Sequence, residues 1–167
     1  MPEDEGELTL APVAGETELE ALVSTVFCDP QTRRGMGWTE RDDPEEAMET
    51  IGGLWHRRLD EGWSIFDVQR TGETIGLAGL GPIEEGRAWW AVYLLERGQG
   101  LGKAIGRRLI DRAAEDGARE VVAVTWAKNE ASRGMLSSLG FEAEGPAPYD
   151  WARESELAWL RYRRELA

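Results

Sequence analysis

The first 60 residues alternate between apolar patterns typical of strands and patterns typical of helices. Residues 8–13 (LTLAPV) predict a short strand, and residues 16–27 predict a helix because their apolar positions recur at helical spacing. An Asp-Pro pair supplies an N-cap and a first-turn proline for a second helix, predicted over 44–60. Residues 29–43, rich in turn formers and charges, predict a long loop that borders a substrate site.

The middle of the chain carries three β-rich runs followed by an amphipathic segment. Residues 63–70, 73–83 and 87–95 are separated by short turn signals, which predicts an antiparallel meander. Residues 101–114 place apolar side chains on one helical face and are followed by Gly117, a typical glycine helix end.

The last third of the chain continues the alternation. Residues 120–126 (EVVAVTW) are almost wholly apolar and predict a buried strand. A short helix is predicted over 129–139, a further strand from Phe141, and the last strand over 155–163. The predicted order, β-α-α-β-β-β-α-β-α-β-β, indicates an α+β fold with a mixed, mainly antiparallel β-sheet flanked by helices.

Composition narrows the class of protein. A length of 167 residues fits a single domain spanning 1–167, because compact domains usually hold about 100–150 residues. The hydrophobic fraction of 41% argues against disorder. The acidic start lacks the features of a secretion signal, so a cytoplasmic location without membrane insertion is expected. Cys28 and His56 are the only residues of their types, which excludes an internal disulfide and makes a metal site a poor expectation.

The net charge and the tryptophan residues indicate which kind of substrate or ligand the protein could bind. A formal net charge of −13 disfavours nucleic acid and favours a cationic amine, although an acidic surface is more commonly a solubility feature. Trp38 and Trp151, in predicted loops, are candidates for an aromatic cage around such an amine, with core packing the stronger default. Trp89, Trp126 and Trp159 fall in predicted strands and are expected to fill the core.

The most informative stretch is the junction R-G-Q-G-L-G at 97–102, where a strand runs directly into a helix. Unpaired N–H groups at a helix start point outward with the positive end of the dipole, and glycines let a bulky phosphate approach the backbone. The junction therefore predicts a pyrophosphate site.

Two common phosphate-binding motifs do not fit this junction. A P-loop needs a glycine and a Ser or Thr at the positions that hold Arg97 and Ala104. A dinucleotide fingerprint needs a glycine where Lys103 stands and an acid near the end of the next strand, which the chain lacks.

The pattern that does fit, R/Q-x-x-G-x-G/A at Arg97, Gly100 and Gly102, resembles that of the GCN5-related N-acetyltransferase (GNAT) superfamily. The resemblance covers residues 87–145 strongly and the whole strand and helix order weakly. It implies a GNAT-like fold, acetyl-CoA as cosubstrate, and a loop whose backbone amides wrap the pyrophosphate. The implied cofactor-binding residues are Val92, Leu94, Arg97, Gly98, Gln99, Gly100, Leu101, Gly102, Lys103, Asn129 and Ser132.

A second stretch resembles the family's N-x-x-A/S-x-x-x-Y/L-x-x-x-G-F pattern. The matching residues are Asn129, Ser132, Leu136, Gly140 and Phe141. The resemblance implies a contact from Asn129 to the pantetheine arm. It is nearest to the branch that acetylates N-termini of ribosomal proteins and related small-molecule amines, and it leaves a homodimer open.

The resemblance also implies a mechanism. A neutral amine, either a protein N-terminus or a small molecule, attacks the thioester directly, and backbone N–H groups around Val92 to Leu94 stabilise the oxyanion. No covalent intermediate forms, so Cys28 is not a nucleophile and is expected to be an ordinary packed cysteine. His56 is likewise expected to be structural.

The proton-transfer groups are less determined. Many family members carry a Tyr at the position of Leu136 and a Pro at the position of Leu94, so here the acid would be Tyr93, Tyr149 or Ser132, or the thiolate leaves unprotonated. Candidate bases are Glu96, Asp150 and the acids of the 29–43 loop, each more commonly a surface charge. The missing Tyr also supports an alternative: a regulatory or degenerate CoA-binding domain without transfer activity.

Overall fold

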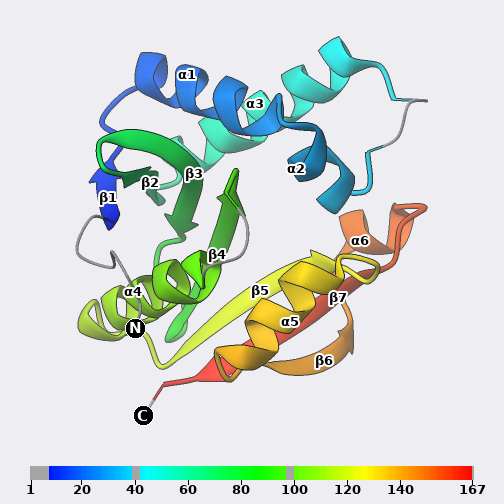
Figure 1. Cartoon of the computed structure of the whole chain (residues 1–167). Helices are drawn as coiled ribbons and strands as arrows, with labels where there is room; N and C mark the ends of the chain where they lie inside the picture. The colour runs from blue at the N-terminus through cyan, green and yellow to red at the C-terminus, as the bar shows by residue number, and fades with distance from the viewer. Residues whose placement is uncertain (1–7, 39–41, 97–99, 167) are drawn as a thin grey trace.

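The computed structural model describes residues 8–38, 42–96 and 100–166, and its strands form one seven-stranded sheet (Figure 1). The strand order across the sheet is β1-β2-β3-β4-β5-β7-β6. The strands are β1 (Leu8–Pro12), β2 (Ser64–Arg70), β3 (Glu73–Leu80), β4 (Arg87–Leu94), β5 (Glu120–Trp126), β6 (Glu142–Pro146) and β7 (Trp159–Glu165). The helices are α1 (Glu16–Phe27), α2 (Pro30–Gly35), α3 (Pro44–Asp60), α4 (Leu101–Glu115), α5 (Glu130–Ser138) and α6 (Asp150–Glu154).

The central strands β4 and β5 stay together for only part of their length. They form the one parallel pair of the described sheet, and all its other neighbours are antiparallel. Their pairing covers three residue pairs, from Arg87 with Glu120 to Trp89 with Val122. Beyond Trp89 and Val122 the two strands diverge, as Figure 1 shows. We call this opening the β4–β5 fork.

The two faces of the sheet carry separate apolar clusters. Successive side chains of a strand point to opposite faces. Trp90 of β4 accordingly lies in one cluster with buried residues of α4 and α5, whereas Ala91 lies in the other with Phe27 of α1 and Trp55 of α3. Helices α4 and α5 therefore cover one face, and α1 and α3 cover the other.

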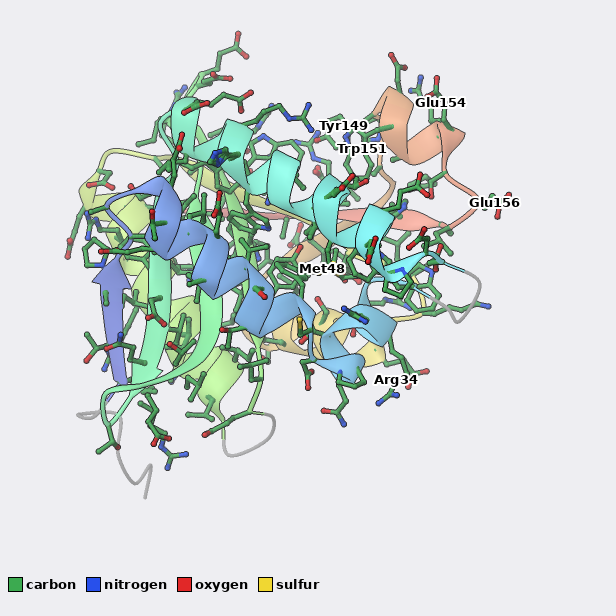
Figure 2. The ribbon with its side chains drawn as sticks, turned by 90° about the horizontal axis from the view of Figure 1, so that it is seen from above. Arg34, Met48, Tyr149, Trp151, Glu154 and Glu156 are labelled. Atoms are coloured by element: carbon green, nitrogen blue, oxygen red, sulfur yellow. The ribbon has the colours of Figure 1, made fainter. Side chains whose placement is uncertain are left out.

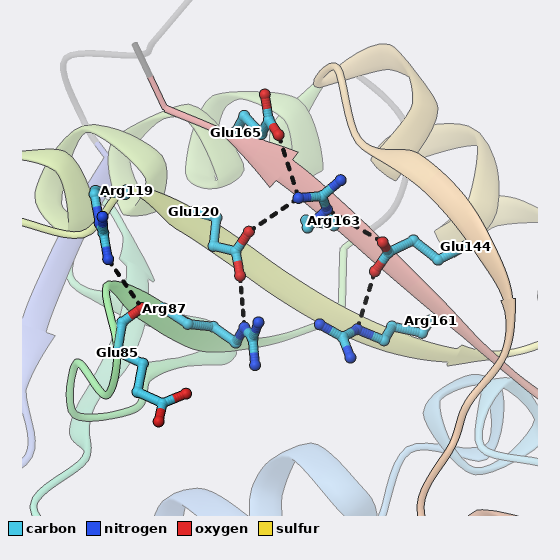
Figure 3. Close-up of polar contacts among 8 residues, drawn as sticks. All are labelled: Glu85, Arg87, Arg119, Glu120, Glu144, Arg161, Arg163 and Glu165. Carbon is cyan, nitrogen blue, oxygen red and sulfur yellow. Dashed lines mark hydrogen bonds and ion pairs between the residues drawn. The ribbon is translucent and has the colours of Figure 1, made fainter.

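Helices α1 and α3 cover their face only over the N-terminal strands of the sheet. The second cluster includes residues of β2, β3 and β4 but no described residue of β5, β6 or β7. There the strands carry charged side chains instead (Figure 3). Glu120 accepts hydrogen bonds from Arg87 (2.6 Å) and Arg163 (3.2 Å). Glu144 pairs with Arg161 (3.0 Å) and Arg163 (3.2 Å). We call these five residues the ion network.

The ion network stabilises the closed end of the fork. Burial by itself raises the pKa of Glu120, but the hydrogen bonds from Arg87 and Arg163 outweigh it and hold that pKa below its ordinary value of 4.5. The carboxylate is therefore charged at neutral pH. Because Arg87 and Glu120 form the first β4–β5 pair, their ion pair joins the two strands just before they diverge.

The predicted order of elements is confirmed, with two helices added. The prediction of an uninterrupted loop over 29–43 is wrong, because α2 lies within it. Asp29 caps this helix by accepting from the Thr32 N–H (2.9 Å), and Pro30 occupies its first turn. Six residues are fewer than two helical turns, too few to show a hydrophobic period. The Asp-Pro signal, which located α3, was present here too.

The prediction that Trp89, Trp126 and Trp159 fill the core is wrong. All three are only partly buried, and the core tryptophans are Trp55 and Trp90. Trp126 and Trp159 are directly paired across β5 and β7. The strand assignment of these residues was right, but it did not reveal that α1 and α3 leave this half of the face uncovered.

Candidate active site

The open edge of β4 carries unpaired backbone groups. The Leu95 N–H donates to the Ile75 carbonyl (2.7 Å), and the Trp89 carbonyl accepts from Gly81 (2.8 Å), so odd-numbered residues of β4 point their backbone groups toward β3. Hydrogen-bonding direction alternates along a strand. The N–H groups of Val92 and Leu94 therefore point into the fork, where no strand of the described chain pairs with them.

The start of α4 supplies a second set of donors, which have no acceptor among the described residues. The first intrahelical bond runs from the Ala104 N–H to the Gly100 carbonyl (3.0 Å), so the N–H groups of the three preceding residues lack acceptors within the helix. Gly100 is the N-cap, in the left-handed conformation (φ 73°). Leu101 is buried in the core and Lys103 is half-buried. The predicted residues Arg97, Gly98 and Gln99 lie outside the described part of the chain.

The two predicted glycines of this turn differ in their surroundings. A Cβ on Gly100 would meet no described atom within 4 Å, whereas a Cβ on Gly102 would lie 2.6 Å from Sδ of Met135 and 3.7 Å from Cδ1 of Leu94. Gly102 thus lets α4 approach both α5 and the open end of β4. It has a packing role irrespective of any ligand.

Asn129 lies beyond the end of β5, on the other arm of the fork. Its Oδ1 accepts from the Ser132 N–H (3.1 Å), which caps α5, and its Nδ2 donates to the Gly35 carbonyl at the end of α2 (3.1 Å). The Ser132 hydroxyl accepts from Thr125 (3.0 Å). Helix capping and the link to α2 account for the Asn129 side chain, and its contact with a pantetheine arm stays a prediction.

Of the candidate acids, Tyr93 belongs to the face under α1 and α3. Its ring packs edge-on against Phe27 (4.9 Å) and Trp55 (6.2 Å). Burial raises the pKa of its phenol above 10.0, against the opposing effect of Arg58, so the hydroxyl is protonated at neutral pH. Leu136, where many relatives carry Tyr, is buried in the core and has no such group.

Tyr149 is brought to the fork by a run of contacting aromatic rings. It packs against Trp89 of β4 (5.1 Å between ring centroids) and lies parallel to Trp151 (5.9 Å, 7°), which in turn contacts Trp159 of β7 edge-on (5.8 Å). We call these four residues the aromatic run. Burial raises the pKa of Tyr149, opposed by Arg161 and Arg87. No periodicity in the sequence could have joined residues from three separate segments.

The candidate bases are engaged elsewhere or exposed. Glu96 is exposed and pairs with Arg70 of β2 (3.1 Å). Asp29 and Asp43 cap α2 and α3, and Asp150 is exposed at the start of α6. Residues 39–41 of the predicted acidic loop lie outside the described residues.

Three further candidates take ordinary roles. His56 pairs with Glu16 (3.4 Å) between α3 and α1. Cys28 is an exposed free cysteine, so its predicted packing is wrong; it ends α1 rather than entering the cluster beneath that helix. The ring of Trp38, a predicted cage residue, already faces the Arg33 guanidinium (5.8 Å).

The described residues contain no group of three or more His, Cys, Asp or Glu placed to hold a metal ion. None of their helices is long and apolar enough to cross a membrane.

Among characterised proteins, the chain is similar to an L-methionine sulfoximine/L-methionine sulfone acetyltransferase of Pseudomonas aeruginosa. The two are 38% identical over 99 residues. The matched stretch covers 54% of this chain and 58% of that relative, little more than half of each protein.

Two solved structures share the fold at low sequence identity. Mycobacterium smegmatis RimJ in complex with CoA-disulfide superposes with a TM-score of 0.72 at 18% identity, covering 95% of this chain and 81% of RimJ. Spermidine N-acetyltransferase from Vibrio cholerae, in complex with CoA and spermine, gives 0.69 at 14% identity and covers 96% of each chain. Residues 7–142 match the family described as Acetyltransferase (GNAT) domain. With the fork, the glycine turn before α4 and this match over most of its length, the chain belongs to the GNAT acetyltransferase family.

Proposed function

We propose that the protein transfers the acetyl group of acetyl-CoA to a primary amine, by direct attack of the amine on the thioester in a ternary complex. The observation that carries this proposal is the juxtaposition of two sets of free N–H groups. One lines the open edge of β4 at Val92 and Leu94, and the other begins α4 after Gly100. The first set suits a thioester oxygen that gains negative charge, and the second suits a pyrophosphate.

Glycine packing supports the same arrangement. Gly102 brings the start of α4 close to both Leu94 and Met135. A molecule with its phosphates on α4 would therefore lie between the two arms of the fork, with its acyl end toward β4. Val92, Leu94 and residues 97–103 would bind the cosubstrate, joined by Asn129 and Ser132 from the β5 arm.

The position of the candidate bases bears on the acceptor. Glu96 pairs with Arg70, Asp29 and Asp43 cap helices, and Asp150 is exposed, so none of these candidates is a buried base. Such a site suits an amine that needs little help to lose its proton. An α-amine, with a pKa of about 8, is partly neutral at pH 7, whereas a lysine-like amine at about 10.4 is not. We therefore propose an α-amine, on a small molecule or a protein N-terminus, as the acceptor.

The proton for the departing thiolate would come from Tyr93 or Tyr149. Both phenols have a raised pKa and are protonated at neutral pH. Ser132 is a third candidate: its hydroxyl accepts from Thr125 (3.0 Å), which leaves its own proton available to donate. With a thiol pKa of about 8.5, departure without a proton is also chemically tolerable.

A CoA-binding domain without transfer activity is the second candidate, favoured by the burial of Leu136 where relatives carry Tyr. Incubation with acetyl-CoA and a panel of amines, with thiol release and product mass as readouts, separates the two. We expect thiol release that depends on an α-amine. CoA binding with no release from any amine would favour the second candidate.

The cosubstrate site has a matched test within α4. Gly100 and Gly117, at opposite ends of the helix, both have positive φ, and a Cβ on either would meet no described atom within 4 Å. Replacing either with Ala forces a side chain into the left-handed region, at a cost of about 1–2 kcal/mol in stability. We expect Gly100→Ala alone to weaken acetyl-CoA binding. Equal affinities in the two variants would contradict the assignment.

A further inference from the structure

We infer that the aromatic run is the surface that binds the body of the acceptor, and that it selects an amine with an uncharged apolar or aromatic group over one with a second positive charge. This inference rests on the proposed transfer to an amine. It adds a substrate class that family membership leaves open.

The position of the run is the first argument. Trp89 is the last residue of β4 that pairs with β5, so the run begins where the fork opens. It continues outward through Tyr149 to Trp151, which is 54% exposed. Such a large exposed ring, stacked parallel on another, offers a flat apolar surface to a ligand.

The length of the acceptor follows from the strand. Val92, whose N–H faces the fork, is three residues beyond Trp89, a separation of about 10 Å along an extended strand. An amine that attacks near Val92 would therefore place on Trp89 and Tyr149 a group roughly that far away. Short amines without such a group would leave the rings unused.

The charges around the run decide between a neutral and a cationic group. Arg161 and Arg87 oppose the rise in the pKa of Tyr149 and Glu144 adds to it, so two positive charges and one negative charge act on this ring. All three belong to the ion network, which holds three Arg against two Glu and is therefore net positive. Figure 2 shows Glu154 and Glu156 at the outer end of the same segment, away from Tyr149 and Trp151. Positive charge beside the rings weakens their attraction for a further cation. The expected aromatic cage for a cationic amine is therefore replaced by a surface for an uncharged group.

The test compares two amines of similar length, 4-phenylbutylamine and 1,6-diaminohexane, titrated calorimetrically into the full chain with CoA present. We expect the phenyl compound to bind at least about tenfold more tightly to the wild type. Trp151→Ala should weaken its binding by about tenfold, whereas Trp151→Phe, which keeps a ring, should stay within about twofold. Ile83→Ala, which removes another exposed apolar side chain outside the run, is the control and should change nothing.

Two results would overturn the inference: tighter or equal binding of the diamine, or unchanged binding of 4-phenylbutylamine by Trp151→Ala. Loss of binding in the Ile83→Ala control would also count against it. Thiol release from acetyl-CoA is measured separately with the α-amines of the panel described under the proposed function. If the binding pattern holds but no amine releases thiol, the proposed transfer fails and the recognition surface stands.

Discussion

The lower and upper parts of the β4–β5 pair are built from the same two strands yet differ in almost every respect. Below the fork, the backbones pair and the ion network joins them through Glu120. Above it, the N–H groups of Val92 and Leu94 point toward β5, but β5 has diverged and does not pair with them. The closed part is held by charges on an uncovered face, and the open part exposes donors that a ligand can use.

The comparison shows how a sheet can keep unpaired backbone N–H groups in its middle while its strands stay together. An unpaired edge in the middle of a sheet costs hydrogen bonds unless something else accepts them. Here the separation is limited at one end by the three paired residues and their ion pair. At the other end, Asn129 links the β5 arm to α2. The fork is therefore bounded on both sides by specific polar contacts.

The largest expected effect comes from removing a donor in the open part. Val92→Pro deletes an N–H that faces the fork, so we expect turnover with an accepted amine to fall about 10²–10³-fold. The β3 ladder, which does not use this N–H, should survive. Ala91→Pro is the matched control, because its N–H points toward β3 and its loss should lower the melting temperature. Full turnover by a folded Val92→Pro protein would show that this N–H takes no part.

The closed part is tested by Glu120→Gln. It leaves Arg87 and Arg163 without their shared carboxylate, so we expect a loss of about 1–3 kcal/mol in urea unfolding. Glu165→Gln is the control, since Glu165 also pairs with Arg163 (3.2 Å) but its side chain is 77% exposed. That variant should lose less than about 1 kcal/mol. Similar losses in both would mean that the burial of Glu120 does not matter.

The stability difference between the wild type and Glu120→Gln should depend on pH. The folded pKa of Glu120 lies below its ordinary value of 4.5, so its charged form stabilises the fold fully above that value. The contribution is lost as pH falls through the folded pKa. We expect the stability difference between wild type and Glu120→Gln to be constant near neutral pH and to shrink below 4.5. A difference that grows in acid would contradict the assigned direction.

The smallest expected effect concerns the other end of the fork. Asn129→Asp keeps the acceptor that caps α5 but loses the donor to Gly35, at a cost of about 0.5–1.5 kcal/mol. Asn129→Ala removes the cap as well, for about 1 kcal/mol more. If Asn129 also holds the cofactor arm, both variants should weaken acetyl-CoA binding. Lower melting temperatures with unchanged CoA affinity would leave it a structural residue only.

Much of the architecture could be predicted because local chemistry specifies it. The Asp-Pro start of α3, the glycine before α4 and the apolar run of β5 each act within a few residues, and the structure has these elements where the pattern predicted them. The short helix α2 was missed although Asp29 and Pro30 carry the same signal as α3. Its brevity, rather than a lack of capping chemistry, hid it.

The candidate site likewise has a part that local sequence specifies and a part that depends on tertiary contacts. The sequence by itself determined the order of elements, the glycine turn and the motif that identifies the family, because these depend on spacing within one segment. Only the tertiary structure decided where β4 and β5 part, which tryptophans remain exposed, and that Trp89, Tyr149, Trp151 and Trp159 form one surface. Those features depend on which half of a sheet face α1 and α3 cover, and on contacts between residues up to 60 positions apart, as between Trp89 and Tyr149. Strand periodicity gives the two faces of a strand, but it does not say which face the rest of the chain will cover.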